Sequence, residues 1–128
     1  MNPAEIVIVC LVATLLVGMG LCAAAYRSFD RLLRIEYQKH RGQWELDGSP
    51  IGFFWVPPGA KTFSGGMARS ELVSTWASAR PHWVEGDDEA SAAYAGFKRL
   101  SRLANRVTLM FVGGFALVWI AIILFLSR

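Results

Sequence analysis

The chain has 128 residues, of which 54% are hydrophobic and 18% charged, and its formal net charge is +3. Ordinary soluble proteins are roughly 45–50% apolar. Two stretches of 21 residues, 6–26 and 107–127, contain no charged residue. Each would be about 31 Å long as a helix, enough to cross a hydrocarbon core of roughly 30 Å. This composition excludes a soluble enzyme, a Rossmann domain and a nucleic-acid-binding domain, and it predicts two membrane spans.

The first span, residues 6–26, follows a short N-terminal segment, residues 1–5. Ala23-Ala24-Ala25 resembles a signal-peptide cleavage site. A signal peptide, however, begins with positive charges and has an apolar run of about 7–15 residues. Here the only charged side chain before the span is Glu5, and the apolar run is longer. We therefore expect a retained span, in which Cys10 and Cys22 are small packing residues.

Basic residues flank the two spans almost entirely on one side, since Arg128 is the only one on the other. Nine Lys and Arg residues lie next to the inner ends of the spans: Arg27, Arg31, Arg34, Lys39 and Arg41 after the first, and Lys98, Arg99, Arg102 and Arg106 before the second. The positive-inside rule then places residues 27–106 in the cytoplasm and both termini in the periplasm of a bacterial inner membrane. Anionic lipid contacts are expected at Arg27, Arg31, Arg34, Arg102 and Arg106.

The segment after the first span has the pattern of an amphipathic helix. It contains no Pro or Gly before Gly42, and its apolar residues recur every three or four positions: Tyr26, Phe29, Leu33, Tyr37, His40 and Trp44. This spacing predicts one stripe of a helix with basic residues on its other faces. Such a helix could lie on the membrane surface or continue the span and pack against another helix.

An aromatic loop, residues 48–66, follows, and a short helix is predicted over residues 67–79. Turn sequences at 47–52 and 57–60 enclose Phe53-Phe54-Trp55-Val56, and Gly65-Gly66 ends the loop. Large aromatic side chains require burial. Three surroundings remain open: a small internal core, the headgroup layer, or a partner's surface. The candidate partner or lipid contacts are Phe53, Phe54, Trp55, Phe63, Trp76 and Trp83.

Residues 88–127 predict one long helix of 40 residues. Asp87 or Asp88 is a suitable N-cap, and no Pro interrupts residues 88–127. An apolar stripe through Tyr94, Phe97 and Leu100 leads into the second span, 107–127. The expected fold is therefore all-α: two transmembrane helices extended into a cytoplasmic antiparallel hairpin, with a short helix and an aromatic loop. Independent helices lying on the membrane are the alternative.

Small residues in both spans indicate helix packing. In the first span Thr14, Gly18 and Cys22 recur every four residues, and Gly113 and Gly114 offer a similar face in the second. Trp119 lies near the middle of its span, where it is better suited to helix packing than to the interface. The two spans could pack on each other or receive a partner helix.

Residues that carry chemistry are scarce. His40 and His82 are far apart and have no neighbours at metal-ligand spacing. Residues 58–62 resemble a phosphate loop only superficially, since the spacing of glycines and lysine is wrong. The sequence therefore predicts no catalytic residue, no cofactor, no metal and no small-molecule substrate, and hence a protein that is not an enzyme. Without charged groups in the spans, a transport role is also disfavoured.

Several short motifs resemble the universal stress protein B family of small two-span bacterial membrane proteins. They are Gly52-Phe53-Phe54, the stretch 76–80, the acidic run 87–89 and Phe97-Lys98-Arg99-Leu100, together covering about residues 48–127. The resemblance implies a stress-associated inner-membrane protein without catalytic activity.

The expected function is that of an interaction or accessory protein of the inner membrane. Its expected partners are membrane lipids and another membrane protein, contacted through the hairpin and the aromatic loop. One alternative is a self-assembling homo-oligomer that organises membrane or lipid. Another is an accessory subunit, without a cofactor, of a respiratory or transport complex.

Overall fold

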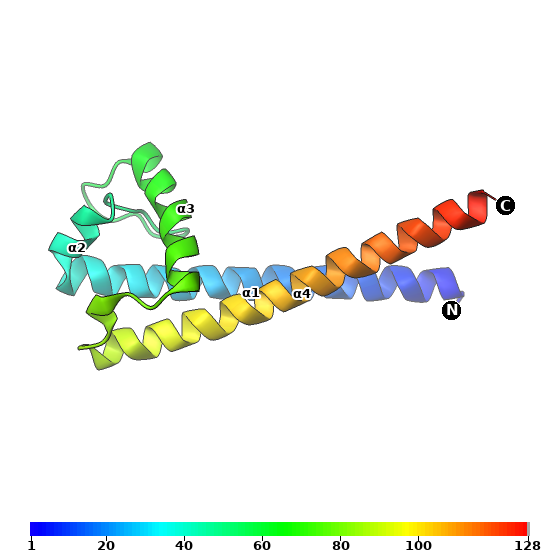
Figure 1. The fold of residues 1–128 in the computed structure, drawn as a ribbon, viewed down its shortest axis with the longest axis horizontal. Helices are drawn as coiled ribbons and strands as arrows, with labels where there is room; N and C mark the ends of the chain where they lie inside the picture. Colours follow the sequence, from blue (N-terminus) through cyan, green and yellow to red (C-terminus); the bar gives the residue numbers. More distant parts are fainter. Residues whose placement is uncertain (128) are drawn as a thin grey trace.

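The computed structural model describes residues 1–127, and all regular structure in that range is helical. The elements are α1 (Pro3–Lys39), α2 (Arg41–Leu46), α3 (Thr62–Ser78), the 3-10 turn η1 (His82–Val84) and α4 (Asp88–Leu126). Two long helices form a rod, with both termini at one end and α2 and α3 at the other (Figure 1). We call the latter end, residues 27–98, the head.

Helices α1 and α4 confirm the prediction of two helices long and apolar enough to cross a membrane. Helix α1 begins with a capping box, in which the Asn2 side chain accepts a hydrogen bond from Ala4 N and the Glu5 side chain accepts one from Asn2 N. Helix α4 is capped by Asp87, whose carboxylate accepts a hydrogen bond of 3.1 Å from Ala90 N. This cap fixes where the second long helix begins.

The apolar stripe predicted to run through Trp44 is interrupted at His40. Residue His40 has φ −128° and ψ 51°, so the chain turns there and α2 begins as a separate helix. In one continuous helix, residues seven positions apart would be about 10 Å apart along the axis. The turn instead brings the ring of Trp44 to 5.0 Å from that of Tyr37. Aromatic packing therefore accompanies the break.

Helix α3 begins earlier than the sequence predicts. It starts at Thr62 and includes Gly65 and Gly66, so the loop before it ends at Lys61 rather than at residue 66. Gly65 serves a close approach rather than a turn. A Cβ at Gly65 would lie only 2.7 Å from Cγ2 of Ile51, and Ile51 N donates a hydrogen bond to the Gly65 carbonyl.

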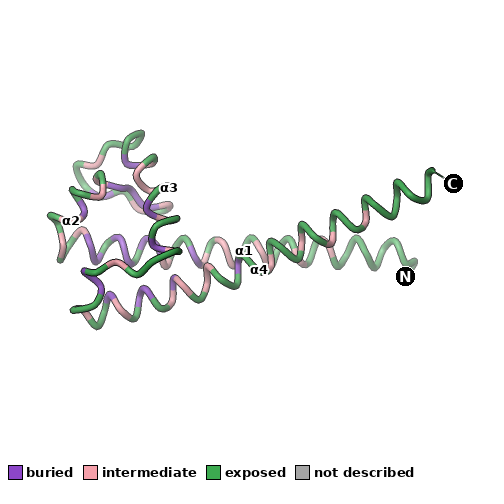
Figure 2. The backbone as a smooth tube through the Cα atoms, viewed as in Figure 1, coloured by how far each residue is buried: buried purple, intermediate pink, exposed green. Residues whose placement is uncertain are grey.

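Helices α1 and α4 run side by side in opposite directions. The rings of Phe29 and Phe97 are 6.0 Å apart, and a Cβ at Gly18 would lie 3.4 Å from Val107 Cγ1. Burial is concentrated in the head, and the ends of the rod near both termini are exposed (Figure 2). The core consists of Phe29, Leu32, Leu33, Ile35, Trp44, Leu72, Trp76, Trp83, Val84, Ala90, Ala93, Tyr94 and Phe97.

Aromatic and polar contacts join α3 and η1 to the two long helices. The ring of Trp76 lies 5.1 Å from that of Phe29 and 5.8 Å from that of Trp83. The hydroxyl of Tyr94 donates a 2.9 Å hydrogen bond to the Trp76 carbonyl, and Lys98 Nζ donates one to the carbonyl of Ala77. The C-terminal end of α3 is therefore fixed to α4 by hydrogen bonds as well as by packing.

Candidate functional site

The aromatic loop is held against α1 by one carboxylate. The two oxygens of Asp30 accept hydrogen bonds of 2.7 Å from the backbone N–H groups of Phe53 and Phe54. Charge-assisted bonds of this length are among the stronger ones in proteins. A Cβ at Gly52 would lie 2.6 Å from both Asp30 Oδ1 and the Trp55 carbonyl oxygen. Glycine is therefore needed at position 52 for the loop to reach Asp30.

Three further side chains fix the loop to the helices. Arg69 of α3 donates a 3.1 Å hydrogen bond to the Gly52 carbonyl, and its guanidinium lies 4.4 Å from the ring centroid of Phe53. The Trp44 indole N–H donates to the Pro50 carbonyl at 3.0 Å, and the Tyr37 hydroxyl donates to the Pro58 carbonyl at 3.2 Å. The loop is thus a fixed part of the head.

The six aromatic residues predicted as contacts fall into three groups. Trp76 and Trp83 are buried in the core, so they offer almost no surface to a partner or to lipid. Phe53 and Trp55 are partly buried and pack against that core. The exposed side chains are Phe54 and Phe63. These last two are the members of the set that another molecule could reach.

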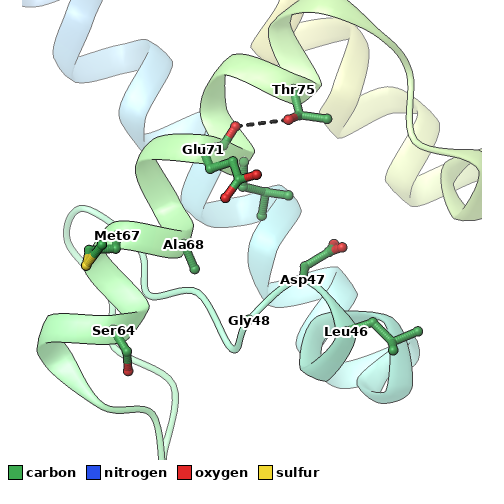
Figure 3. Close-up of a pocket in the computed structure, with 9 residues that line it drawn as sticks. Leu46, Asp47, Gly48, Ser64, Met67, Ala68, Glu71 and Thr75 are labelled. Atoms are coloured by element: carbon green, nitrogen blue, oxygen red, sulfur yellow. Dashed lines mark hydrogen bonds between the residues drawn. The ribbon is translucent and has the colours of Figure 1, made fainter.

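A groove lies between α2 and α3 (Figure 3). Its volume is about 690 Å³, and its lining is partly apolar and partly acidic. The lining residues are Leu46, Asp47, Gly48, Ser64, Met67, Ala68, Glu71, Leu72 and Thr75. Leu46 and Met67 are 82% and 63% exposed, and Phe63, one helical turn before Met67, is 83% exposed. Leu46 and Met67 thus leave exposed apolar surface on opposite walls of the groove, and Phe63 adds exposed apolar surface one helical turn away.

Glu36 is an acidic residue inside the core. Its side chain is fully buried, and neither carboxyl oxygen has a hydrogen-bond partner among residues 1–127. Loss of hydration on burial, together with the nearby carboxylate of Asp47, raises the pKa of Glu36 to about 9. The Glu36 carboxyl is therefore neutral at pH 7.

Sequence reasoning did not single out Asp30 and Glu36. Both interrupt the face of α1 that contacts the loop and α4, one residue after Phe29 and three after Leu33. An acidic side chain beside an apolar stripe is the signal that could have identified them. The burial of both residues shows that the stripe is wider than the aromatic positions alone indicate.

The predicted lipid-contacting arginines lie on two different faces. Arg27, Arg31 and Arg34 line a cleft of about 240 Å³ together with Asp30, Phe54 and Trp55. The Arg34 guanidinium is 5.0 Å from the Trp55 ring centroid, and that of Arg27 is 6.0 Å from that of Phe54. Arg102 and Arg106 line a separate groove on α4. The two sets therefore form two basic surfaces.

The predicted packing residues of the spans also divide in two. Thr14, Gly18 and Cys22 line a cavity of about 230 Å³ with Val107, Thr108 and Phe111, so this face of α1 meets α4. At Gly113 and Gly114 a Cβ would meet nothing within 4 Å, and Trp119 is 52% exposed. The two helices diverge toward the termini, which leaves this part of α4 uncovered (Figure 1).

Among residues 1–127, no three His, Cys, Asp or Glu side chains come together in a group that could hold a metal ion. The two cysteines, Cys10 and Cys22, are free thiols. Compared with known protein families, curated proteins and solved structures, the chain matches none.

Proposed function

We propose that the chain is a non-enzymatic accessory protein of a bacterial inner membrane that binds a partner protein through its head. In this proposal α1 and α4 cross the bilayer, and their extensions form a cytoplasmic antiparallel hairpin. The hairpin carries α2, α3 and the aromatic loop. Both termini lie in the periplasm.

The charge distribution supports this orientation. Nine Lys and Arg residues lie on the head side of the apolar stretches, within the segments that the positive-inside rule counts. The hydrophobic window of each long helix is unburied, as expected for surface that faces lipid.

The observation that carries the proposal is the exposed apolar surface at the groove between α2 and α3. The head has its own core, so Leu46, Phe63 and Met67 are not needed to complete it. Large apolar side chains left exposed around a groove are typical of interaction sites. The groove lies beside α2, which is at the end of the rod away from both termini (Figure 1), so in the proposed orientation it is on the side of the head away from the bilayer.

The charges of the groove indicate the chemistry of the partner. Its ionisable lining residues are Asp47 and Glu71, both acidic. An amphipathic helix with an apolar face and flanking Lys or Arg residues would complement this lining. We therefore infer that the partner contributes a basic amphipathic helix, with its apolar face on Met67 and Leu46.

The test is site-specific photocrosslinking of the full chain in native membranes. A photoreactive residue in place of Phe63 should give one heteromeric adduct, and the crosslinked peptide should be a basic amphipathic segment. The matched control places the same group at Ala92, an exposed position on α4, and should give no such adduct.

Charge removal makes the test specific to the groove. Glu71→Gln should weaken the adduct several-fold, whereas Glu85→Gln, an equal change at an exposed site outside the groove, should leave it unchanged. An adduct that is insensitive to Glu71, or the absence of any adduct at position 63, would refute the proposed partner.

A self-assembling protein is the second candidate, and the uncovered stretch of α4 favours it. Gly113 and Gly114 have open space around them, so a helix of a second copy could approach closely. Oxidative crosslinking through the exposed Cys10 should then give a disulfide-linked homodimer in membranes. A larger respiratory or transport complex remains the third form that the partner could take.

The proposal includes a stress-associated role only because residues 48–127 resemble the universal stress protein B family. The accessory role does not depend on this resemblance.

A further inference from the structure

A basic groove lies where α4 passes the end of α3. Its volume is about 550 Å³. One wall comes from Arg80, in the linker between α3 and η1, and the other from α4, which contributes Lys98, Arg99, Arg102 and Arg106. Five basic side chains from two segments therefore border a single space.

The basic side chains converge because of helical spacing and the fixed position of the linker. Residues 98, 102 and 106 are four positions apart, which places them on one face of α4. Arg80 donates a 2.7 Å hydrogen bond to Ser91 Oγ, and its guanidinium lies 6.0 Å from the ring centroid of Tyr94. Burial raises the pKa of Tyr94, while the nearby charges of Arg80 and Arg102 oppose that effect.

No carboxylate compensates these charges within the described part of the chain. The groove lining contains neither Asp nor Glu, and the ion pairs among residues 1–127 involve Lys39, His40 and Arg41 instead. Uncompensated cations around one groove attract an anion. The cations are also spread out, since Lys98 and Arg106 are about 12 Å apart along the helix axis.

The groove opens onto the apolar surface of α4. Leu103 is in its lining, and Val107 begins the charge-free stretch directly after Arg106. Met110 is exposed and lies one turn after Arg106, on the face of α4 that carries the groove. A ligand that matches this surface has an anionic part next to the arginines and an apolar part along α4.

We propose that this groove binds the headgroup of a phospholipid with two phosphates, such as diphosphatidylglycerol, with the acyl chains along Leu103 and Met110. Basic pockets at the cytoplasmic ends of transmembrane helices recognise headgroups of this kind. The inference rests on the membrane orientation proposed above and is independent of the partner groove. Basic side chains borne over about 12 Å of helix suit a headgroup with two phosphates better than one with a single phosphate.

The test is native mass spectrometry of the full chain in mild detergent. The probes are diphosphatidylglycerol, phosphatidylglycerol at equal phosphate, and inorganic pyrophosphate. We expect one retained diphosphatidylglycerol per chain at a concentration about tenfold lower than phosphatidylglycerol requires. The double variant Arg99→Gln/Arg102→Gln should weaken this binding about tenfold to thirtyfold.

The matched control is Arg27→Gln/Arg31→Gln, which removes the same charge from the other basic surface and should retain the lipid. Tryptophan fluorescence melting checks that both variants fold. Equal losses in the two double variants, or equal binding of the two lipids, would show general attraction to anionic membrane and overturn the proposal. Tight binding of pyrophosphate without lipid would overturn it in favour of a soluble anion.

Failure of this proposal is distinguishable from failure of the proposed function. If the chain resists alkaline extraction from membranes but binds both lipids equally, the headgroup site alone is refuted. If alkaline extraction releases the chain, the membrane orientation is refuted, and the headgroup site with it.

Discussion

The head and the apolar end of the rod, where both termini lie, differ in how their apolar side chains are covered. In the head, aromatic residues from α1, α2, α3, η1 and α4 surround one another, and hydrogen bonds fix the segments between them. Toward the termini, α1 and α4 meet around Gly18 and Val107 and then expose apolar side chains on both helices. The head completes its own core, whereas the ends of the rod require lipid or another helix to cover them.

Specific recognition of another molecule is therefore expected in the head rather than along the apolar helices. Surface that lipid covers needs to be apolar but not precisely shaped. The head lies outside the lipid, so exposed apolar side chains on it are not covered by lipid. Apolar surface there indicates a binding site for a specific partner. Two substitutions and a change of pH test how far the two regions differ in stability.

The largest expected effect comes from the centre of the head. Trp76, 2% exposed, contacts Phe29 and Trp83, and Trp76→Ala should lower the free energy of unfolding of the head by about 3–5 kcal/mol. Denaturant unfolding in detergent, followed by tryptophan fluorescence, measures it. Trp119→Ala, in the apolar stretch, is the control and should change the value by less than about 1 kcal/mol. Equal effects would show that the two regions unfold as one unit.

An intermediate effect is expected where the aromatic loop meets α1. Asp30→Ala removes the acceptor for Phe53 N and Phe54 N, and should destabilise the head by about 2–3 kcal/mol. Hydrogen exchange at these two amides should accelerate, while exchange within α4 at residues 110–120 stays the same. Asp30→Asn keeps one good acceptor, so the stability of its head should lie between that of the parent chain and that of Asp30→Ala. Unchanged exchange at residues 53 and 54 would contradict the contact.

The third effect comes from the buried carboxyl of Glu36 and is the smallest within a single pH unit, although it accumulates over a wider pH range. The pKa of Glu36 is about 9 in the folded chain and 4.5 ordinarily. Between pH 4.5 and 9, the carboxyl is therefore protonated in the folded chain and ionised in the unfolded chain. Stability of the head should therefore fall as pH rises from 4.5 to 9, by at most about 1.4 kcal/mol per pH unit.

Thermal melting of the head at pH 5, 7 and 8.5 measures this dependence. Glu36→Gln carries no ionisable proton and should flatten it, with a higher melting temperature than the parent chain at pH 8.5. The charge-free stretches 6–26 and 107–127 contain no Asp, Glu, His or Lys, so no comparable buried carboxyl contributes there. A melting temperature that rises with pH in the parent chain would contradict the account.

The sequence predicts the long helices well because their signals are continuous. The charge-free stretches and the Asp87 cap need only local information, and both helices begin and end within a few residues of the expected positions. The break at His40 and the early start of α3 depend on contacts across the head. Trp44 packs on Tyr37, and Gly65 on Ile51. Such contacts are invisible to periodicity along the chain.

For the candidate sites, the sequence predicts which residue types are in excess but not where they come together. An excess of aromatic residues correctly indicates that the central segment contains more than a solvated loop, but it does not separate the buried Trp76 from the exposed Phe63. The basic residues near the spans suggest lipid contact, yet the groove also includes Arg80, which lies 18 residues before Lys98 in the sequence. Only the folded head brings Arg80 to α4.

The antiparallel register of the long helices has a consequence for the membrane itself. Gly18 stands level with Val107, so the charge-free part of α1 extends eight residues further toward the head than that of α4. The stretch in which neither helix carries a charge is then about 13 residues, or about 20 Å. This is shorter than a bilayer core of roughly 30 Å, a hydrophobic mismatch that local thinning of the bilayer or snorkelling of Arg106 relieves. Inserted in this register, the protein would favour thin regions of membrane and locally deform thicker ones.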